Sequence, residues 1–330
     1  MVYLRTGQSG CHDEKGEPIP CRGSGQDAAF RRGMAWPTPR FAVRGELVED
    51  RLTRLVWCRH ANPAEFPLTW QEALDFVADL RASTWLDYSD WRLPNRRELR
   101  SLLSHQTRRP ALPEGHPFSG VFPSWYWTST SVALAPRHAW YVNLDGARTF
   151  FGGKDQSFFV WPVRGQSRVL SQTGQMVCYG VDGSPRKCQS SGEDGELQTG
   201  QPWPEPRMVV TPDGMEDQLT ALVWHPDTDA GRGPVNWLEA LSVVASLGGD
   251  WRLPNINELD SLVDCGRCEP ALPLGHPPGR VCPGYWSSTT SMFEPDWAWA
   301  LYTQSGGIGV GQKRGRHFHV WAVRDSIGGD

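Results

Sequence analysis

The sequence predicts an α+β protein of two tandem domains, each with two helices, a small twisted antiparallel sheet and long loops. Three observations support this: a series of motifs that occurs twice, two capped helical segments in each copy, and short aromatic or β-branched stretches after the second helix. The 35 Gly and 27 Pro, beside only 21% charged residues, are typical of short strands joined by many turns.

The duplication is visible in paired motifs. Trp-Arg-Leu-Pro-Asn occupies residues 91–95 and recurs at 251–255. Other motifs recur 159, 160 or 167 positions later, among them Trp36-Pro-Thr-Pro-Arg40 as Trp203-Pro-Glu-Pro-Arg207, Tyr126-Trp127 as Tyr285-Trp286, and Val160-Trp161 as Val320-Trp321. We therefore predict two homologous domains, residues 1–167 and 168–330, because about 160 residues are enough for a separate core.

Each copy contains two helices that begin with a capping box, in which an Asn or Thr cap is followed three residues later by Glu. The four boxes are Thr69 with Glu72, Asn95 with Glu98, Asn236 with Glu239, and Asn255 with Glu258. The longer helices carry a core-facing stripe at helical spacing, namely Trp70, Ala73, Leu74, Val77 and Leu80, and Trp237, Ala240, Leu241, Val244 and Leu247. The shorter second helix is predicted to run through Leu103 or Val263.

Stretches with a period of two follow the second helix and predict an antiparallel sheet. In the first copy they cover residues 126–131, 138–143, 148–151 and 157–163, and the second copy repeats them between Tyr285 and Val323. The Trp residues that alternate within these stretches are predicted to be buried, because alternate positions of a strand face the core.

Composition and charge exclude several classes of partner. With 33 Lys+Arg, 37 Asp+Glu and a net charge of −4, no basic surface for nucleic acid is predicted. Mean hydropathy is −0.48, and no apolar run approaches the roughly 18 residues of a transmembrane segment. The first residues show no basic flank followed by an apolar stretch, so we recognise no signal peptide. The chain is then either cytoplasmic or lacks its export signal in this sequence.

Two cysteine pairs recur with the same spacing. Cys11 and Cys21 lie ten residues apart across a Gly-containing turn, as do Cys178 and Cys188. We predict a disulfide in each pair. Because disulfides persist in oxidising compartments, this favours an extracellular, periplasmic or cell-surface protein.

The other four cysteines, Cys58, Cys265, Cys268 and Cys282, have no counterparts in the other copy. Cys265-Gly-Arg-Cys268 could be half of a zinc site, but no second ligand pair follows at suitable spacing. A loop disulfide between Cys268 and Cys282 is the favoured alternative.

The order of the motifs, from the cysteine pair through Asp-Trp-Arg-Leu-Pro-Asn to Tyr-Trp-Ser-Ser-Thr and a terminal Val-Arg, resembles the bacterial Lcl C-terminal domain family, a domain of unknown function. The resemblance covers nearly the whole chain, twice, and residues 90–95 and 250–255 are its most specific part. Members are similar to C-type-lectin-like and formylglycine-generating-enzyme-like folds. The resemblance implies an exported or surface protein, with glycan or host-matrix binding in the best understood case.

The Trp-Arg-Leu-Pro-Asn motif allows two interpretations. Arg92 and Arg252 could clamp an anion, and Asn95 or Asn255 could bind sugar hydroxyls. The structural interpretation is favoured, because the Asn already serves as a helix cap and the Trp and Leu bracket a turn into a core-facing helix.

Function is predicted to lie in loops that differ between the copies on a fixed frame. Two such loops are residues 132–138, with Arg137 and His138, and residues 292–297, with Glu294, Asp296 and Trp297. Glu294-Pro295-Asp296 resembles the calcium tripeptide of C-type lectins, whereas the first copy has Ala-Pro-Arg there. Calcium therefore stays an alternative, and no cofactor is predicted.

A second candidate is the basic segment 312–319, whose ligand-binding side chains would be Lys313, Arg314, Arg316, His317 and His319. It could attract sulfated or carboxylated glycans through bidentate arginine contacts, or it could be a solvated hairpin tip. His317 and His319 would share one strand face, as metal ligands can, but the first copy has Ser157 and Phe159 there. No metal site is predicted.

Catalytic motifs are not recognisable: the sequence has no nucleophile elbow, Walker A loop or His-Glu-x-x-His. We predict a non-catalytic protein, exported or on the cell surface, that recognises glycans or a surface protein through loops on a lectin-like scaffold. Two alternatives stay open, a structural or protein-interaction module of the envelope and a formylglycine-generating-enzyme-like domain. The sequence does not set the oligomeric state.

Overall fold

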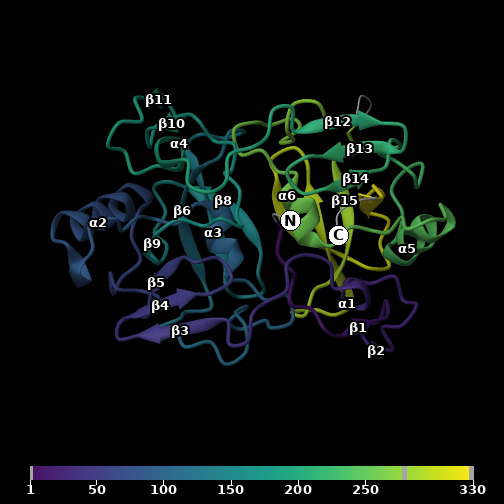
Figure 1. The fold of residues 1–330 in the computed structure, drawn as a ribbon, viewed down its shortest axis with the longest axis horizontal. Coiled ribbons are helices and arrows are strands. Elements are labelled where there is room, and N and C mark those ends of the chain that lie inside the picture. The colour runs from purple at the N-terminus through teal and green to yellow at the C-terminus, as the bar shows by residue number, and fades with distance from the viewer. Residues whose placement is uncertain (1–2, 277–280, 327–330) are drawn as a thin grey trace.

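The two copies of the repeat build the same elements in the same order (Figure 1). The protein is represented by a computed structural model that describes residues 3–276 and 281–326. Its helices are α1 (Asp27–Phe30), α2 (Trp70–Ala82), α3 (Arg96–Ser101), α4 (Asp194–Leu197), α5 (Trp237–Ser246) and α6 (Ile256–Ser261), with a short 3₁₀ turn η1 (Trp85–Asp87). The mixture of helices and antiparallel sheets confirms the α+β class.

A six-stranded antiparallel sheet runs through both copies. Each copy contributes three strands, which are β6 (Trp125–Ser131), β7 (His138–Asn143) and β8 (Thr149–Gly153), and β15 (Gly284–Thr290), β16 (Trp297–Tyr302) and β17 (Gly307–Gln312). Their order is β15-β16-β17-β8-β7-β6, so the copies join where Ile308 of β17 pairs with Thr149 of β8. The largest core cluster likewise contains residues from both copies.

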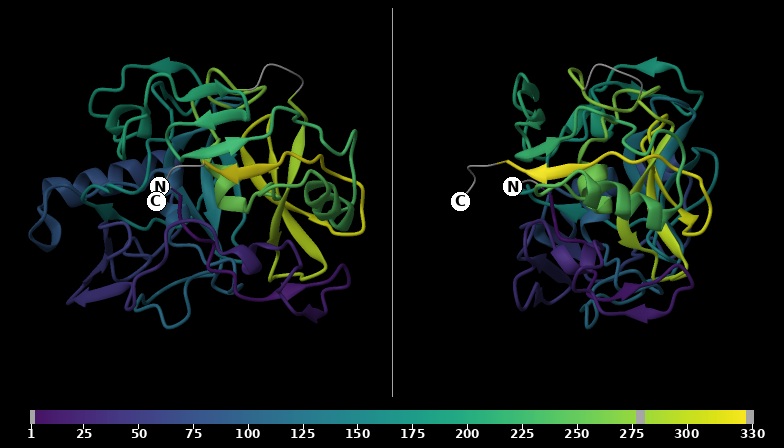
Figure 2. Two further views of the ribbon diagram at one scale, coloured as in Figure 1. Left: turned by 45° about the vertical axis from the view of Figure 1, so that its right-hand side comes forward. Right: turned by 90° about the vertical axis from the view of Figure 1, so that its right-hand side faces the viewer.

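Two four-stranded sheets and two hairpins complete the strands. The sheets consist of β3 (Phe41–Arg44), β4 (Leu47–Asp50), β5 (Val56–Cys58) and β9 (Val163–Arg164), and of β12 (Met208–Thr211), β13 (Gly214–Asp217), β14 (Leu222–Trp224) and β18 (Val323–Asp325). The hairpins are β1 (Cys11–His12) with β2 (Pro18–Ile19), and β10 (Cys178–Tyr179) with β11 (Pro185–Arg186). The last strand of each copy returns to its own sheet, as β18 does beside β14 (Figure 2).

The predicted helix caps are confirmed, because all four capping boxes are present. The Trp that opens each long helix is fully buried against the central sheet. Its indole N–H donates to a strand carbonyl, from Trp70 to Thr128 at 2.8 Å and from Trp237 to Ser287 at 2.7 Å. The short helices end at Ser101 and Ser261, two residues earlier than predicted. After α3 the chain turns away, since the Ser104 N–H donates to the Ala111 carbonyl.

The strand predictions were partly right. Residues 138–143 coincide with β7, and 126–131 lie within β6. Residues 157–163 do not form the predicted strand, because Phe158 and Phe159 make single bridges to Leu68 and Tyr126, in different parts of the fold. The strands β3 to β5 and β12 to β14, with the short helices α1 and α4, were not predicted.

The cysteine hairpins are exchanged between the copies. The first hairpin segment (residues 3–34, with β1, β2 and α1) packs on the second copy, and the second hairpin segment (residues 170–201, with β10, β11 and α4) packs on the first copy. Gln8 exchanges two hydrogen bonds with the Thr290 backbone, at 2.8 and 3.0 Å, and Gln175 does so with the Ser131 backbone, at 2.7 and 2.8 Å. In Figure 1 the purple first segment lies beside β15, and the teal second segment lies beside β6.

A buried ionic contact between α3 and α6 ties the copies together further. Asp260 lies 2.6 Å from Arg96 and 3.1 Å from Arg100, and Arg97 donates to the Val263 carbonyl at 2.7 Å. Burial alone would raise the pKa of Asp260, but the guanidinium groups of Arg100 and Arg96 lower it well below its usual range. The junction is therefore held by charge as well as by the shared sheet.

Candidate ligand-binding cleft

The two loops predicted to bind ligand contact the exchanged hairpins. Arg137 Nε donates to the Asp182 carbonyl at 2.9 Å, at the tip of the β10–β11 hairpin. In the second copy Pro295 and Asp296 pack against Gly16 of the other hairpin so closely that a Cβ there would lie 3.0 Å from the Asp296 nitrogen. Residues 132–138 and 292–297 thus act as seats for the hairpins.

Three other predicted site residues of these loops, His138, Glu294 and Trp297, are half-buried. His138 packs edge-on against Phe151, with ring centroids 5.7 Å apart. The Trp297 N–H donates to the Glu294 carbonyl at 2.8 Å, and both side chains are half-buried. These predicted site residues are therefore not gathered on one open face.

Lys313 is fully buried, which corrects the prediction that it contacts ligand. Its ammonium donates to the carbonyls of His12 and Asp13, both at 3.0 Å, and lies 4.2 Å from the centroid of the Trp237 ring. Burial lowers its pKa to about 7. Lys154 does the same in the first copy, donating to the Tyr179 carbonyl at 2.8 Å. Each lysine therefore clamps an exchanged hairpin.

The remainder of the basic segment divides into exposed and paired side chains. Arg314, Arg316 and His317 are exposed, and Arg316 Nη1 lies 3.2 Å from a Glu239 carboxylate oxygen. His319 is half-buried, and its Nδ1 lies 2.9 Å from Asp229 Oδ1. His319 therefore contacts Asp229, whereas His317 is exposed.

The Trp-Arg-Leu-Pro-Asn motif has the structural role that was favoured. Arg92 and Arg252 are buried and make bidentate contacts to Glu98 and Glu258, with the shorter bond at 2.6 Å in each case. The cap side chains also reach the exchanged segments, since Asn95 Nδ2 donates to Thr199 Oγ1 at 3.0 Å and Asn255 Nδ2 to the Arg32 carbonyl at 3.4 Å. The Asn of the motif thus caps the short helix and also binds the exchanged hairpin segment.

An open cleft of about 680 Å³ lies where the second hairpin segment meets the second copy. Its lining comes from residues 172–179, from the Trp-Pro-Glu-Pro-Arg motif, and from the chain after α6. Apolar side chains stand open to solvent there, with Met176 70% exposed and Leu274 72% exposed. Clustered exposed apolar side chains in a concave site are typical of a ligand-binding surface.

Two aromatic side chains, Trp203 and Tyr179, lie among the lining residues. The Trp203 indole N–H donates to the Gln172 carbonyl at 2.9 Å, and the Arg207 guanidinium lies 4.3 Å from the ring centroid. The charge of Arg207 is already compensated by the bidentate contact to Asp217 at 3.0 and 2.8 Å. The ring is therefore held in a fixed orientation.

The polar groups of the cleft are few. Asp264 is buried, which raises its pKa, and its Oδ1 accepts the Gly266 N–H at 2.9 Å. Arg267 is exposed at the same edge. The cleft thus combines an apolar surface with a carboxyl group, a guanidinium and glutamine amides.

The first copy has two smaller hollows at the corresponding segments, one of about 200 Å³ beside Trp36 and one of about 520 Å³ beside residues 106–116. There Gln106 Oε1 accepts the backbone N–H groups of Ser9 and Gly10, at 2.8 and 3.3 Å. The corresponding residue of the second copy is Gly266, which has no side chain to fill the gap. Sequence reasoning missed this cleft, although the change from Gln106 to Gly266 was a visible signal.

The family model of the Lcl C-terminal domain matches residues 46–164 and 213–324. The chain belongs to the Lcl C-terminal domain family. The two matched ranges are tandem copies of this domain, and both hairpin segments lie outside them, as does the whole 172–208 wall of the cleft. A search of the curated proteins found no match.

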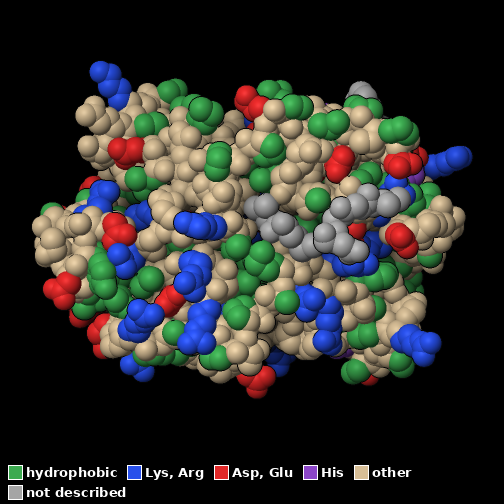
Figure 3. Space-filling view, in the orientation of Figure 1, with side chains coloured by type: hydrophobic (Ala, Val, Ile, Leu, Met, Phe, Trp, Pro, Cys, Tyr) green, Lys and Arg blue, Asp and Glu red, His purple; other side chains and the backbone are tan. Residues whose placement is uncertain are grey.

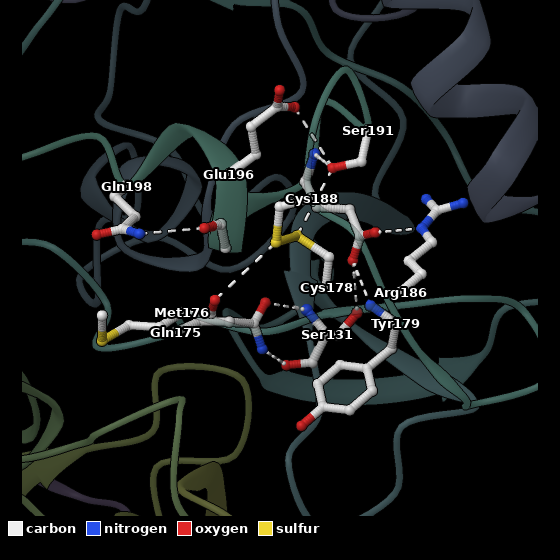
Figure 4. The surroundings of a disulfide bond; sticks show 12 residues. Ser131, Gln175, Met176, Cys178, Tyr179, Arg186, Cys188, Ser191, Glu196 and Gln198 are labelled. Atoms are coloured by element: carbon white, nitrogen blue, oxygen red, sulfur yellow. Dashed lines mark hydrogen bonds and ion pairs between the residues drawn. A yellow bond between two sulfur atoms is a disulfide. The ribbon is translucent and has the colours of Figure 1, made fainter.

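Both predicted disulfides of the Lcl C-terminal domain protein are confirmed. They join Cys11 to Cys21 and Cys178 to Cys188, within the exchanged hairpins. Figure 4 shows the second of these beside Gln175 and Ser131, the contact that fastens this hairpin to the first copy. Such disulfides fit a surface or extracellular module.

The proposed disulfide between Cys268 and Cys282 is not formed. Cys282 is buried, and its backbone N–H donates to the Tyr285 hydroxyl at 2.8 Å. This bond holds Cys282 beside the start of β15. Its Sγ lies with the side chains of Asp229 and His319. Cys268 is half-buried and lies near Tyr179.

Two of the cysteines outside the disulfides, Cys58 and Cys265, are buried. Burial raises the pKa values of Cys58 and Cys265 to about 12, so neither thiol is readily ionised. The Lcl C-terminal domain is not a known catalytic family. None of the described helices combines the length and apolarity needed to cross a bilayer.

Proposed function

We propose that this tandem Lcl C-terminal domain protein is a non-catalytic, lectin-like binding protein that acts at the cell surface, in the periplasm or outside the cell, and that it binds glycans in the cleft beside Trp203. The observation that carries the proposal is the cleft of about 680 Å³, in which Met176 and Leu274 are about 70% exposed. Stable soluble folds rarely leave such side chains together in a concavity without a ligand.

The chemistry of the lining suits a sugar. A pyranose ring has an apolar face that can stack on Trp203 or Tyr179, and its hydroxyls need donors and acceptors around the edge. Asp264, Arg267 and Gln172 supply such groups. On the face drawn in Figure 3, Lys and Arg side chains gather over the lower half and are sparse over the upper half, where Figure 1 places β10 to β12. This distribution favours stacking over purely ionic recognition.

The frame is suited to hold such a cleft in one shape. Trp203 is fixed by Gln172 and Arg207, and the segment that carries Gln172 is fastened to the first copy by the hydrogen bonds of Gln175 with the Ser131 backbone. A preorganised site loses less conformational entropy on binding. The disulfides also support action in an oxidising compartment.

The test is a glycan-array screen of the purified, oxidised chain at low and physiological salt, followed by affinity measurements on any glycan found. Leu274→Ser and Met176→Ser should weaken binding about tenfold, as expected for contacts within a binding hot spot. Phe66→Ser is the matched control, because Phe66 is 71% exposed but lies outside the cleft. It should leave the affinity unchanged.

Two results would contradict the cleft as the site. Binding that survives both cleft variants but is lost on changing Arg314 and Arg316, with strong salt dependence, would place recognition on the basic segment. A chain that binds no glycan at either salt concentration, while its disulfides are intact, would favour the protein-interaction alternative.

A further inference from the structure

We propose that Asp229, Cys282 and His319 form a binding site for a divalent transition-metal ion, with Zn²⁺ as the expected ion. One ligand atom from each side chain lies within 4.8 Å of the other two, and within the described residues this is the only such group. A thiolate, an imidazole and a carboxylate together are a ligand set that zinc favours over calcium or magnesium.

The three side chains are brought together by rigid backbone. The His319 N–H donates to the Gly284 carbonyl at 3.0 Å, and its carbonyl accepts the Trp286 N–H at 3.1 Å. The Cys282 N–H is fixed by the Tyr285 hydroxyl. Asp229 Oδ1 already lies 2.9 Å from His319 Nδ1, so a metal ion bound by both would take the place of the hydrogen-bonded proton. Little rearrangement is needed to close the site.

The first copy shows what this position contains when it is purely structural. Phe122 and Phe159 stack there with ring centroids 4.7 Å apart and an interplanar angle of 2°. The positions correspond, because the Phe122 N–H donates to the Tyr126 hydroxyl as that of Cys282 does to Tyr285. Phe159 also bridges to Tyr126 as His319 bridges to Tyr285.

The second copy has therefore replaced a stacked apolar pair by a thiol and an imidazole, with a carboxylate beside them. Loss of an aromatic stack lowers stability by about 1 kcal/mol beyond the lost burial, so folding alone does not favour the exchange. Metal binding accounts for all three residue types at once.

Three protein ligands leave one position of a tetrahedral zinc ion for water or another ligand. The side chain of Asp229 is 33% exposed, which gives an ion a path from solvent, whereas Cys282 is buried. None of the three residues lines the cleft beside Trp203. The metal site and the proposed glycan site are therefore separate and can fail separately.

The experiment uses the full chain, freed of metal with a chelator and handled under argon. Titration with Co²⁺ should give one bound ion per chain and a thiolate-to-cobalt charge-transfer absorption in the near ultraviolet. Addition of Zn²⁺ should abolish that absorption, because zinc binds such sites more tightly than cobalt. No saturable Co²⁺ or Zn²⁺ binding to the folded chain would overturn the proposal.

Variants then assign the ligands. Cys282→Ser should remove the charge-transfer absorption, and Asp229→Asn should weaken Zn²⁺ binding by about tenfold or more, since even supporting residues of metal sites have effects of that size. Cys268→Ser and His317→Ala are matched controls, one another thiol and one a neighbouring exposed imidazole, and both should bind as the wild type does. Circular dichroism verifies folding, and Asp229→Asn serves as the test if Cys282→Ser does not fold. Absorption that persists in Cys282→Ser, or is lost in Cys268→Ser, would refute the site.

Discussion

The buried carboxyl group of Asp27 should make stability depend on pH in a way that one substitution removes. Asp27 lies in the first hairpin segment, fully buried, and its Oδ2 accepts the hydroxyls of Thr6 and Thr289, both at 2.7 Å. Its pKa is raised from 3.8 to about 6: burial is the main cause, the Thr hydroxyls and Arg252 lower the pKa, and the nearby Glu258 raises it, with about 6 as the net value. The carboxyl is thus most compatible with the fold when it is protonated.

The sign of the effect follows from the raised pKa. A folded-state pKa of about 6 against 3.8 means that the folded protein holds this proton more tightly, so its contribution to stability is complete below pH 3.8 and is lost as the pH rises through about 6. The difference corresponds to about 3 kcal/mol. Asp27→Asn keeps an acceptor for both Thr hydroxyls and cannot ionise. Its stability relative to the wild type should therefore rise by about 2 to 3 kcal/mol between pH 4 and pH 8.

The assay is urea unfolding followed by tryptophan fluorescence at several pH values in this range. Comparing variant with wild type cancels other titrating groups, Asp260 among them. Asp155→Asn is the control for the substitution itself, because Asp155 is exposed. If Asp27→Asn keeps the wild-type pH dependence, the reasoning about the buried carboxyl is refuted.

Four further outcomes are expected. Asp194→Asn should gain unfolding free energy relative to the wild type as the pH rises, as Asp27→Asn does, because burial also raises the pKa of Asp194 to about 6. A difference in unfolding free energy that stays constant with pH would contradict this. Replacing both Cys178 and Cys188 by Ser should lower the unfolding free energy by about 3 kcal/mol, as the loop-entropy relation predicts for a short loop, measured by urea unfolding. Asp260→Asn should cost about 3 to 5 kcal/mol by leaving buried arginines uncompensated, whereas Asp90→Asn, at the exposed pair with Arg164, should cost at most about 1 kcal/mol. Fragments 1–167 and 168–330, expressed together, should co-elute on size exclusion, because the hairpin of each fragment packs on the other fragment. Two separate stable monomers would contradict the exchange.

Local patterns predicted the helix starts and the role of the Trp-Arg-Leu-Pro-Asn motif. A capping box involves residues three apart, and the Arg92–Glu98 pair lies within six residues, so neighbouring sequence determines both. The exchange of the hairpins could not be predicted in this way. Gln8 and Gln175 are equivalent residues facing equivalent seats, and the pattern does not say which hairpin occupies which seat.

Lys313 shows a different limit of sequence reasoning. A lysine in a run of basic residues is expected at the surface, because burial of an ammonium group is costly. Here two carbonyls and the Trp237 ring compensate that cost, and all three come from segments distant in sequence. The equivalent residue of the first copy, Lys154, is the only basic residue between Arg148 and Arg164. A lysine kept there without basic neighbours indicated that the position of Lys313 has a structural role.

The two copies stabilise each other, but they carry different residues at the two proposed sites. In the first copy Gln106 binds the backbone of Ser9 and Gly10 beside two smaller hollows, and Phe122 stacks on Phe159. In the second copy Gly266 opens the cleft, and Cys282 and His319 replace the stack. Each change removes packing, and a single small domain has little stability to spare. Because the copies share one sheet and each holds the other's hairpin, contacts with the first copy also stabilise the second. This coupling explains why both proposed sites lie in or beside the second copy.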